Sequence, residues 1–174
     1  SRKDLLPSTD YYGPYTLTAD KVTAATVVNY LNRGAIKLQK TDVKSGAKLA
    51  GAVFTLTAEA VDDETAALLE AAGFTRDDET GLYFRQGTTD KNGSLSFTNV
   101  PRMRRDNQAL IQYTLTEVTA PEGYVPPTYT ETVVAGETLK NNQYVTNVKV
   151  TNDPQGTIQL QKSIINVWES DMGN

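Results

Sequence analysis

A lysine, a glutamate and an asparagine stand where alternating strand patterns would bury them. In the segment GAIKLQKTD, strand parity puts Lys40 on the same face as the apolar isoleucine and leucine. By the same parity, Glu117 extends the apolar row of YTLTE, and Asn152 extends that of VKVTN. Burying a lone ammonium, a carboxylate or an unpaired amide is costly. We therefore expect these three side chains to meet one another.

Two interpretations of this group are open. The simpler one is a buried ion pair between Lys40 and Glu117, with Asn152 hydrogen-bonded nearby. The other is chemical, because desolvation lowers the pKa of a lysine and raises that of a glutamic acid, so that a neutral amine faces a protonated acid. The amine is then a nucleophile, and the acid can polarise the asparagine carbonyl and stabilise the oxyanion. The product is an amide between Lys40 and Asn152, with ammonia released.

The elements that must position this group are short strands separated by turn signals such as KSGAK, DKNG and APEGY. Alternating segments rich in Val, Thr, Tyr and Phe are typical of strands. The expected strands are 35–40, 52–58, 81–86, 94–98, 110–118, 129–134 and 144–151. Their number and spacing predict an all-β antiparallel sandwich or barrel.

One segment, VDDETAALLEAAGF at 61–74, predicts a short helix inserted between two strands. Asp62 or Asp63 can cap its start, acidic residues occupy its first turn, and Gly73 can end it. We expect Leu68 and Leu69 to cover one edge or face of the sandwich. Binding of a partner by this helix is the alternative.

The composition excludes several classes of function. The chain has 174 residues, is 39% hydrophobic and has a net charge of −4, which allows a sizeable core and does not favour binding to nucleic acid. It contains no Cys and no His, which removes thiolate and imidazole chemistry and disulfides. DKNG resembles the opening of a calcium loop but lacks the later ligands. We expect no metal, no cofactor, no membrane insertion and no turnover enzyme.

An internal repeat indicates how the chain is organised. VVNYLNRGAIKLQK at 27–40 returns as VTNDPQGTIQLQK at 150–162. The repeat predicts three parts: the end of a preceding unit or linker at 1–33, one complete unit at 34–155, and the first strand of a following unit at 156–174.

The two incomplete units predict neighbours. Asn29 matches Asn152, and Lys162 matches Lys40, so both are possible partial sites of neighbouring units. Neither end carries a YxLxE glutamate, so we expect no bond between them. The partners of the complete unit are therefore tandem units of a longer chain or head-to-tail neighbours.

Several motifs together resemble a known family. The segments LQKTD, SGAKLAGAVFTL, GTTDKNGSLSFTNV, YTLTEVTAPEGY and VKVTNDP are similar to the Cna B-type (collagen-adhesin B-type, prealbumin-like, Ig-like) domain of Gram-positive surface adhesins and SpaA-type pilins. The resemblance implies an extracellular, cell-wall-anchored protein with an intramolecular isopeptide bond. Carried over, the bond joins Lys40 to Asn152 and Glu117 promotes it. The pilin YPKN motif and a sorting signal are not visible in this segment.

Two functions follow as hypotheses. One is a structural module of a stalk or pilus, cross-linked once by its own residues. The other is a ligand-binding adhesin module that recognises a host extracellular-matrix protein or glycan through the 61–80 insert and the 102–110 loop. That loop carries Arg102, Arg104 and Arg105, which form either a solvated basic cluster or a site for an acidic partner.

Overall fold

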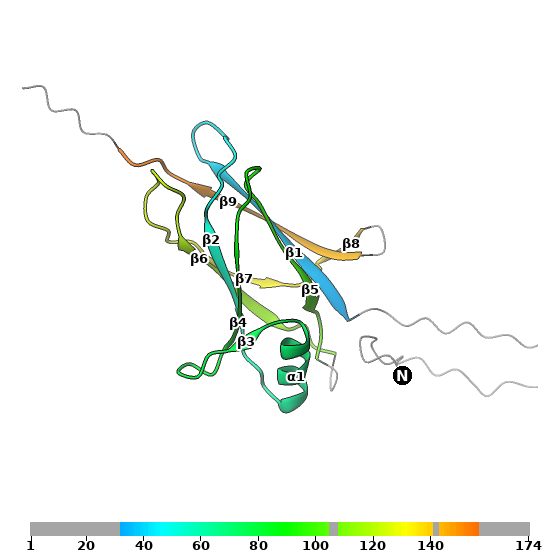
Figure 1. The fold of residues 1–174 in the computed structure, drawn as a ribbon. Helices are drawn as coiled ribbons and strands as arrows, with labels where there is room; N and C mark the ends of the chain where they lie inside the picture. Colours follow the sequence, from blue (N-terminus) through cyan, green and yellow to red (C-terminus); the bar gives the residue numbers. More distant parts are fainter. Residues whose placement is uncertain (1–31, 105–107, 141–142, 157–174) are drawn as a thin grey trace, which may run out of the picture.

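Two β-sheets packed face to face make up the domain, with one helix at one end (Figure 1). The computed structural model describes residues 32–104, 108–140 and 143–156. The four-stranded sheet has the order β5-β1-β9-β8 and the five-stranded sheet the order β3-β4-β2-β6-β7. The strands are β1 (Arg33–Asp42), β2 (Val53–Ala58), β3 (Thr75–Arg76), β4 (Tyr83–Thr88), β5 (Ser94–Pro101), β6 (Gln112–Thr119), β7 (Thr130–Val134), β8 (Thr138–Lys140) and β9 (Gln143–Asn152).

The predicted β-sandwich is confirmed, and each predicted strand is present. The short strands β3 and β8 were not predicted, because two or three exposed residues carry no alternating pattern. One pairing also differs from an all-antiparallel scheme: β1 and β9 are parallel neighbours, with Lys40 opposite Val150 and Asp42 opposite Asn152. Parallel strands need a long crossover. Here nearly the whole domain is that crossover, so the first and last strands lie side by side.

The core lies between the sheets and follows the strand alternation. It includes Ile36 from β1, Phe54 and Leu56 from β2, and Tyr113 and Leu115 from β6, all of them fully buried. Burying each such side chain contributes about 1.5–3 kcal/mol. This apolar layer surrounds the inward-facing polar residues of the same strands.

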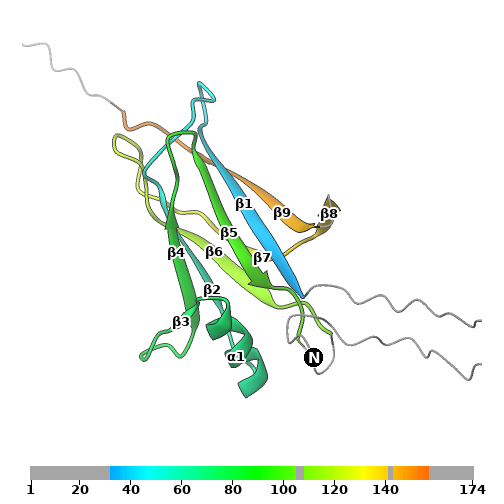
Figure 2. The same ribbon diagram turned by 45° about the vertical axis from the view of Figure 1, so that its right-hand side comes forward.

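The predicted helix is confirmed as α1 (Asp63–Ala71). Its N-cap is Asp62, whose carboxylate accepts from the Thr65 backbone N–H at 2.6 Å. Gly73 follows the helix with φ of 82°, a left-handed conformation that suits glycine. Leu69 is fully buried in the core cluster. The helix therefore covers the lower end of the sandwich (Figure 2).

The prediction of a solvated arginine loop is wrong for Arg102, which is buried. Strand β5 runs to Pro101, and the Ile111 backbone N–H donates to the Arg102 carbonyl at 2.8 Å, so this part of the loop is a hairpin. The Arg102 side chain is 6% exposed, and its guanidinium lies 3.4 Å from the centre of the Tyr144 ring. Burial lowers its pKa. Arg105 lies outside the described residues.

Candidate cross-linking site

Lys40, Glu117 and Asn152 meet in the core, each contributed by a different strand. Lys40 Nζ donates to Glu117 Oε2 at 2.8 Å and to Asn152 Oδ1. Asn152 Nδ2 donates to Glu117 Oε1 at 3.1 Å. Their exposed fractions are 0% for Lys40, 3% for Glu117 and 9% for Asn152. The three polar groups therefore satisfy one another in a nearly dry environment.

The surroundings favour the neutral form of the lysine. Burial lowers the Lys40 pKa from its ordinary value of 10.5, although the hydrogen bond and the charge of Glu117 act in the opposite direction. The Phe54 ring centre lies 5.7 Å from Nζ, so an apolar ring occupies one side of the amine where water would otherwise stand. Proton loss from this lysine is easier than from an exposed one.

The orientation of the Asn152 amide differs from the one predicted. The sequence interpretation put Glu117 on the amide oxygen, but that oxygen accepts from Lys40, and Glu117 contacts the amide nitrogen. In the opposite orientation, the amide N–H groups would face the ammonium group of Lys40. Both groups are hydrogen-bond donors, so no hydrogen bond could form between them. Glu117 therefore lies beside both the attacking nitrogen and the nitrogen that an attack would release.

Backbone contacts hold the strand ends that carry the site. The Lys40 N–H donates to the Gly93 carbonyl at 2.7 Å, and the Val43 N–H donates to the Asn152 carbonyl at 3.0 Å. Gly93 has φ of 66°, and a Cβ there would lie 2.4 Å from the Lys40 oxygen, so only glycine fits. The end of β1 is thus fixed to β9 one residue after Asp42.

The connection from β6 to β7 folds back over the end of β9. The Val125 N–H donates to the Asp153 carbonyl at 3.0 Å, and the Gln155 N–H donates to the Gly123 carbonyl at 2.9 Å. The Glu117 N–H donates to the Tyr129 carbonyl at 3.1 Å. The sequence indicated APEGY as a turn and as part of a family motif, but not that it packs against the end of β9.

Other predicted features fall elsewhere. Asn29 and Lys162 lie outside the described residues, as do most of the two predicted flanking units, so both remain predictions. Asn32 is 1% exposed and exchanges two hydrogen bonds with the Met103 backbone, at 2.7 and 2.8 Å. In the part of the chain that the structure describes, the one helix is too short and too polar to cross a membrane.

The solved structures to which this chain is similar include the following three proteins. The pilus 2b backbone protein of group B streptococcus is 21% identical with a TM-score of 0.48, and the match covers 80% of this chain and 46% of that one. The full-length major pilin SpaD from Corynebacterium diphtheriae is 20% identical with a TM-score of 0.47, with 70% and 30% covered. The Bacillus anthracis TIE protein is 19% identical with a TM-score of 0.46, with 72% and 17% covered. The chain spans less than half the length of each.

No curated protein matches this chain. The family model described as the SpaA prealbumin-like fold domain matches residues 34–154. That range agrees with the one over which the sequence motifs resemble the family. Since the match covers well over half of the sequence, the chain belongs to the SpaA prealbumin-like fold domain family.

Proposed function

We propose that this domain is a structural module of a Gram-positive surface stalk or pilus, stiffened by an isopeptide bond between Lys40 and Asn152. The observation that carries the proposal is the closed set of hydrogen bonds among Lys40, Glu117 and Asn152 in the core. An amine, a carboxyl group and an amide held together without water supply the proximity that free groups lack.

The bond can form in three proton transfers and one substitution. Glu117 Oε2 takes a proton from Lys40 Nζ, and the neutral amine attacks Cγ of Asn152. The carboxyl group then gives a proton to Nδ2, the C–N bond breaks and ammonia leaves. The new amide nitrogen finally gives its extra proton to the Glu117 carboxylate. One amide replaces another, so no oxidant, metal or cofactor is required. The domain reacts once on itself and turns over no substrate.

The position of the bond suits a load-bearing role. Strand β1 begins at one end of the sandwich and β9 ends at the other, beside the far end of β1 (Figure 1). A pulling force that enters at Arg33 runs along β1 to Lys40, crosses the bond to Asn152 and leaves the domain. The residues between Lys40 and Asn152 then carry no load.

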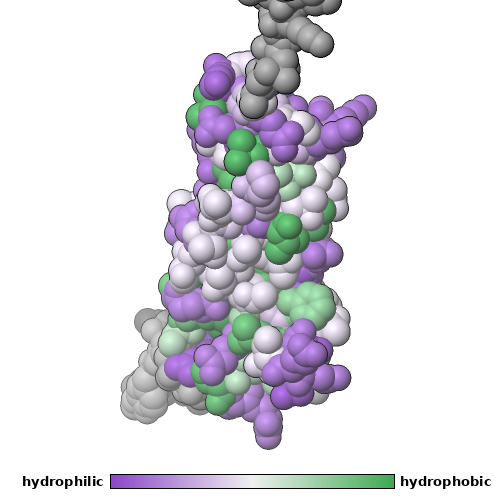
Figure 3. All heavy atoms as spheres, turned by 90° about the vertical axis from the view of Figure 1, so that its left-hand side faces the viewer, coloured by the Kyte–Doolittle hydropathy of each residue, from purple (hydrophilic) through white to green (hydrophobic). Residues whose placement is uncertain are grey.

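The setting that we propose is extracellular and cell-wall-anchored, with tandem or head-to-tail domains as neighbours. Membership of the SpaA family supports this. The face shown in Figure 3 agrees with a spacer, because its apolar side chains form separate spots among hydrophilic ones. Broad apolar patches are typical of binding surfaces.

Single-molecule stretching tests the mechanical role. When the wild-type chain is pulled by its two ends, we expect only the residues outside 40–152 to extend. Lys40→Ala should lengthen by the whole domain, and Lys37→Ala, an exposed lysine of the same strand, should behave as wild type. Full extension of the wild-type domain would exclude the proposed role.

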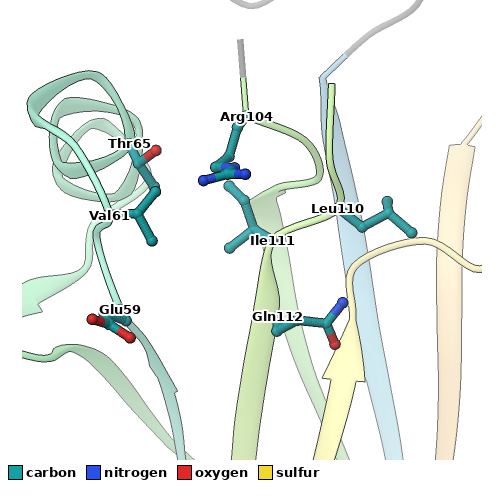
Figure 4. A pocket seen from close by; sticks show the side chains of 7 residues that line it. All are labelled: Glu59, Val61, Thr65, Arg104, Leu110, Ile111 and Gln112. Carbon is teal, nitrogen blue, oxygen red and sulfur yellow. The ribbon is translucent and has the colours of Figure 1, made fainter. Parts of the chain in front are cut away.

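A second candidate function has one observation in its favour. A pocket of about 320 Å³ lies between the helical insert and the β5–β6 hairpin, where the ligand-binding hypothesis put its site (Figure 4). Its lining residues are Glu59, Val61, Thr65, Arg104, Leu110, Ile111 and Gln112. Apolar walls with a few polar groups are typical of ligand sites. The ligand of such an adhesin module would be a host protein or glycan.

Substitutions in the pocket test this alternative. Val61 and Leu110 are 56% and 41% exposed, so an aspartate at either position should leave the fold intact. On arrays of matrix proteins and glycans, an adhesin module should bind a ligand and lose it in Val61→Asp and Leu110→Asp. Leu139→Asp, far from the pocket and also exposed, is the control. If all three variants still bind the ligand, this pocket is not the binding site.

A further inference from the structure

The reaction centre has a neighbouring pocket on its asparagine side. A pocket of about 260 Å³ lies between the end of β9, including Asn152, and the connection from Val125 to Tyr129. Asn152 is also the most exposed of the three reacting residues. Solvent therefore comes closest to the reacting groups here, and something must keep it from Lys40.

Tyr129 lines this pocket and also packs on the ring that lies against the lysine. It lines the pocket, and its ring packs edge to face on Phe54, with ring centres 6.2 Å apart and an interplanar angle of 73°. The Phe54 ring in turn lies against Lys40 Nζ. The Tyr129 carbonyl accepts from the Glu117 N–H, and its hydroxyl donates to Glu131. The side chain is thus held from β2 and β7, and the backbone of the residue from β6.

We propose that Tyr129 is a positioning residue for the cross-link, whose ring keeps water in the pocket away from Lys40 and so favours the reactive neutral amine. This inference rests on the proposed function. It follows from the geometry: removing the ring would join the pocket to the apolar side of Phe54. Water there would solvate the ammonium and remove part of the desolvation that favours proton loss.

Several ionisable side chains lie near the lysine and its neighbouring pocket. Among the described residues packed around the site, they are Glu117 on β6, Asp42 on β1, Tyr124 and Tyr129 in the connection, Glu131 on β7, and Asp153 directly after β9. Hydrogen bonds from Ser45 lower the Asp42 pKa to about 2, and burial raises the pKa of both tyrosines. Between about pH 5 and about pH 9, Asp42 therefore stays ionised and both tyrosines stay neutral.

The test follows bond formation against time and pH. The full chain, purified in denaturant before it has folded, is diluted into buffers from about pH 5 to about pH 9, and intact mass records the loss of ammonia. For Tyr129→Ala we expect a pH midpoint about one unit higher than wild type, and a rate near neutral pH about tenfold lower, since one unit changes the neutral fraction tenfold. Tyr129→Phe keeps the ring and should match the wild-type midpoint.

The outcomes separate this inference from the proposed function. A wild-type chain that loses no ammonia at any pH overturns the proposed function itself. If the wild type reacts and Tyr129→Ala has the same midpoint, or Tyr129→Phe shifts equally, the role of the ring is wrong. Should Tyr129→Ala fail to fold by circular dichroism, Tyr129→Leu decides instead. It keeps apolar volume without the ring and should shift the midpoint in the same direction by a smaller amount.

Discussion

Glu117 carries the proposed chemistry at the scale of single residues. Among the described residues, it is the one group in contact with both nitrogens that exchange places on Asn152, because Oε2 faces Lys40 and Oε1 faces the amide Nδ2. A carboxyl group in that position can accept a proton from the attacking nitrogen and give a proton to the leaving nitrogen. General acid–base catalysis of this kind contributes about 10²–10⁴-fold to a rate.

Glu117→Gln tests that role, because it keeps the shape of the side chain and removes the proton carrier. We expect bond formation at least about 10²-fold slower than in wild type, measured by intact mass during folding. Glu122→Gln, an exposed carboxylate in the β6–β7 connection, should react at the wild-type rate. An unchanged rate in Glu117→Gln would mean that Lys40 and Asn152 react without it.

Asp42 contributes a pH-dependent part of the stability next to the site. Its carboxylate accepts from the Ser45 backbone N–H, the Ser45 hydroxyl and the Lys44 backbone N–H, at 2.6, 2.9 and 2.8 Å. These hydrogen bonds lower its pKa from 3.8 to about 2. A lowered carboxyl pKa stabilises the fold above the unfolded value, and this stability is lost as pH falls through the folded value.

Asp42→Asn should therefore remove one pH-dependent component of stability. In urea unfolding near neutral pH, we expect wild type to be more stable than Asp42→Asn. The difference should shrink as pH falls from about 4 to about 2, where the aspartate takes up its proton. A difference that stays constant over that range would show that the charge of Asp42 plays no part.

At the scale of elements, strand parity was enough to find the residues that meet. Alternation within single strands put Lys40, Glu117 and Asn152 on inward faces, and parity is a local property of a strand. The parallel pairing of β1 with β9 could not be predicted in this way, since it depends on the path of the whole chain. The burial of Arg102 on Tyr144 and the position of Tyr129 beside Phe54 are also long-range contacts without a local pattern.

Helix α1 offers a prediction at the same scale. The Asp62 carboxylate caps the first turn, and removing such a cap costs about 0.5–2 kcal/mol. Asp62→Ala should lower the free energy of unfolding by about 1 kcal/mol in urea melts. Asp78→Ala, whose side chain is 99% exposed, should leave it unchanged. Equal losses in the two variants would mean that the cap adds nothing specific.

At the scale of the whole molecule, the cross-link would close most of the domain into one covalent loop. Lys40 and Asn152 are 112 residues apart in sequence, yet their side chains touch. If the loop-entropy account of disulfides applies, closing a loop of this length stabilises by about 4–5 kcal/mol. With this bond, we expect the domain to resist heat and protease beyond what its packing alone provides.

Lys40→Ala should therefore be much less stable than wild type. We expect a loss of more than about 4 kcal/mol, because the variant lacks the loop constraint and also leaves Glu117 buried without its hydrogen-bond partner. Thermal melts and protease digestion measure the difference, with Lys37→Ala as the matched control. Equal melting temperatures for wild type and Lys40→Ala would contradict the covalent loop.

The most direct measurement of the central claim is the intact mass of the folded chain, followed by tandem mass spectrometry of its peptides. The account predicts a mass lower than the sequence mass by one ammonia, and a branched peptide that joins Lys40 to Asn152. Lys40→Ala and Glu117→Gln should keep the full sequence mass of their variants. A wild-type chain at its full sequence mass, with Lys40 and Asn152 in separate unmodified peptides, would show that the three residues form only a buried ion pair.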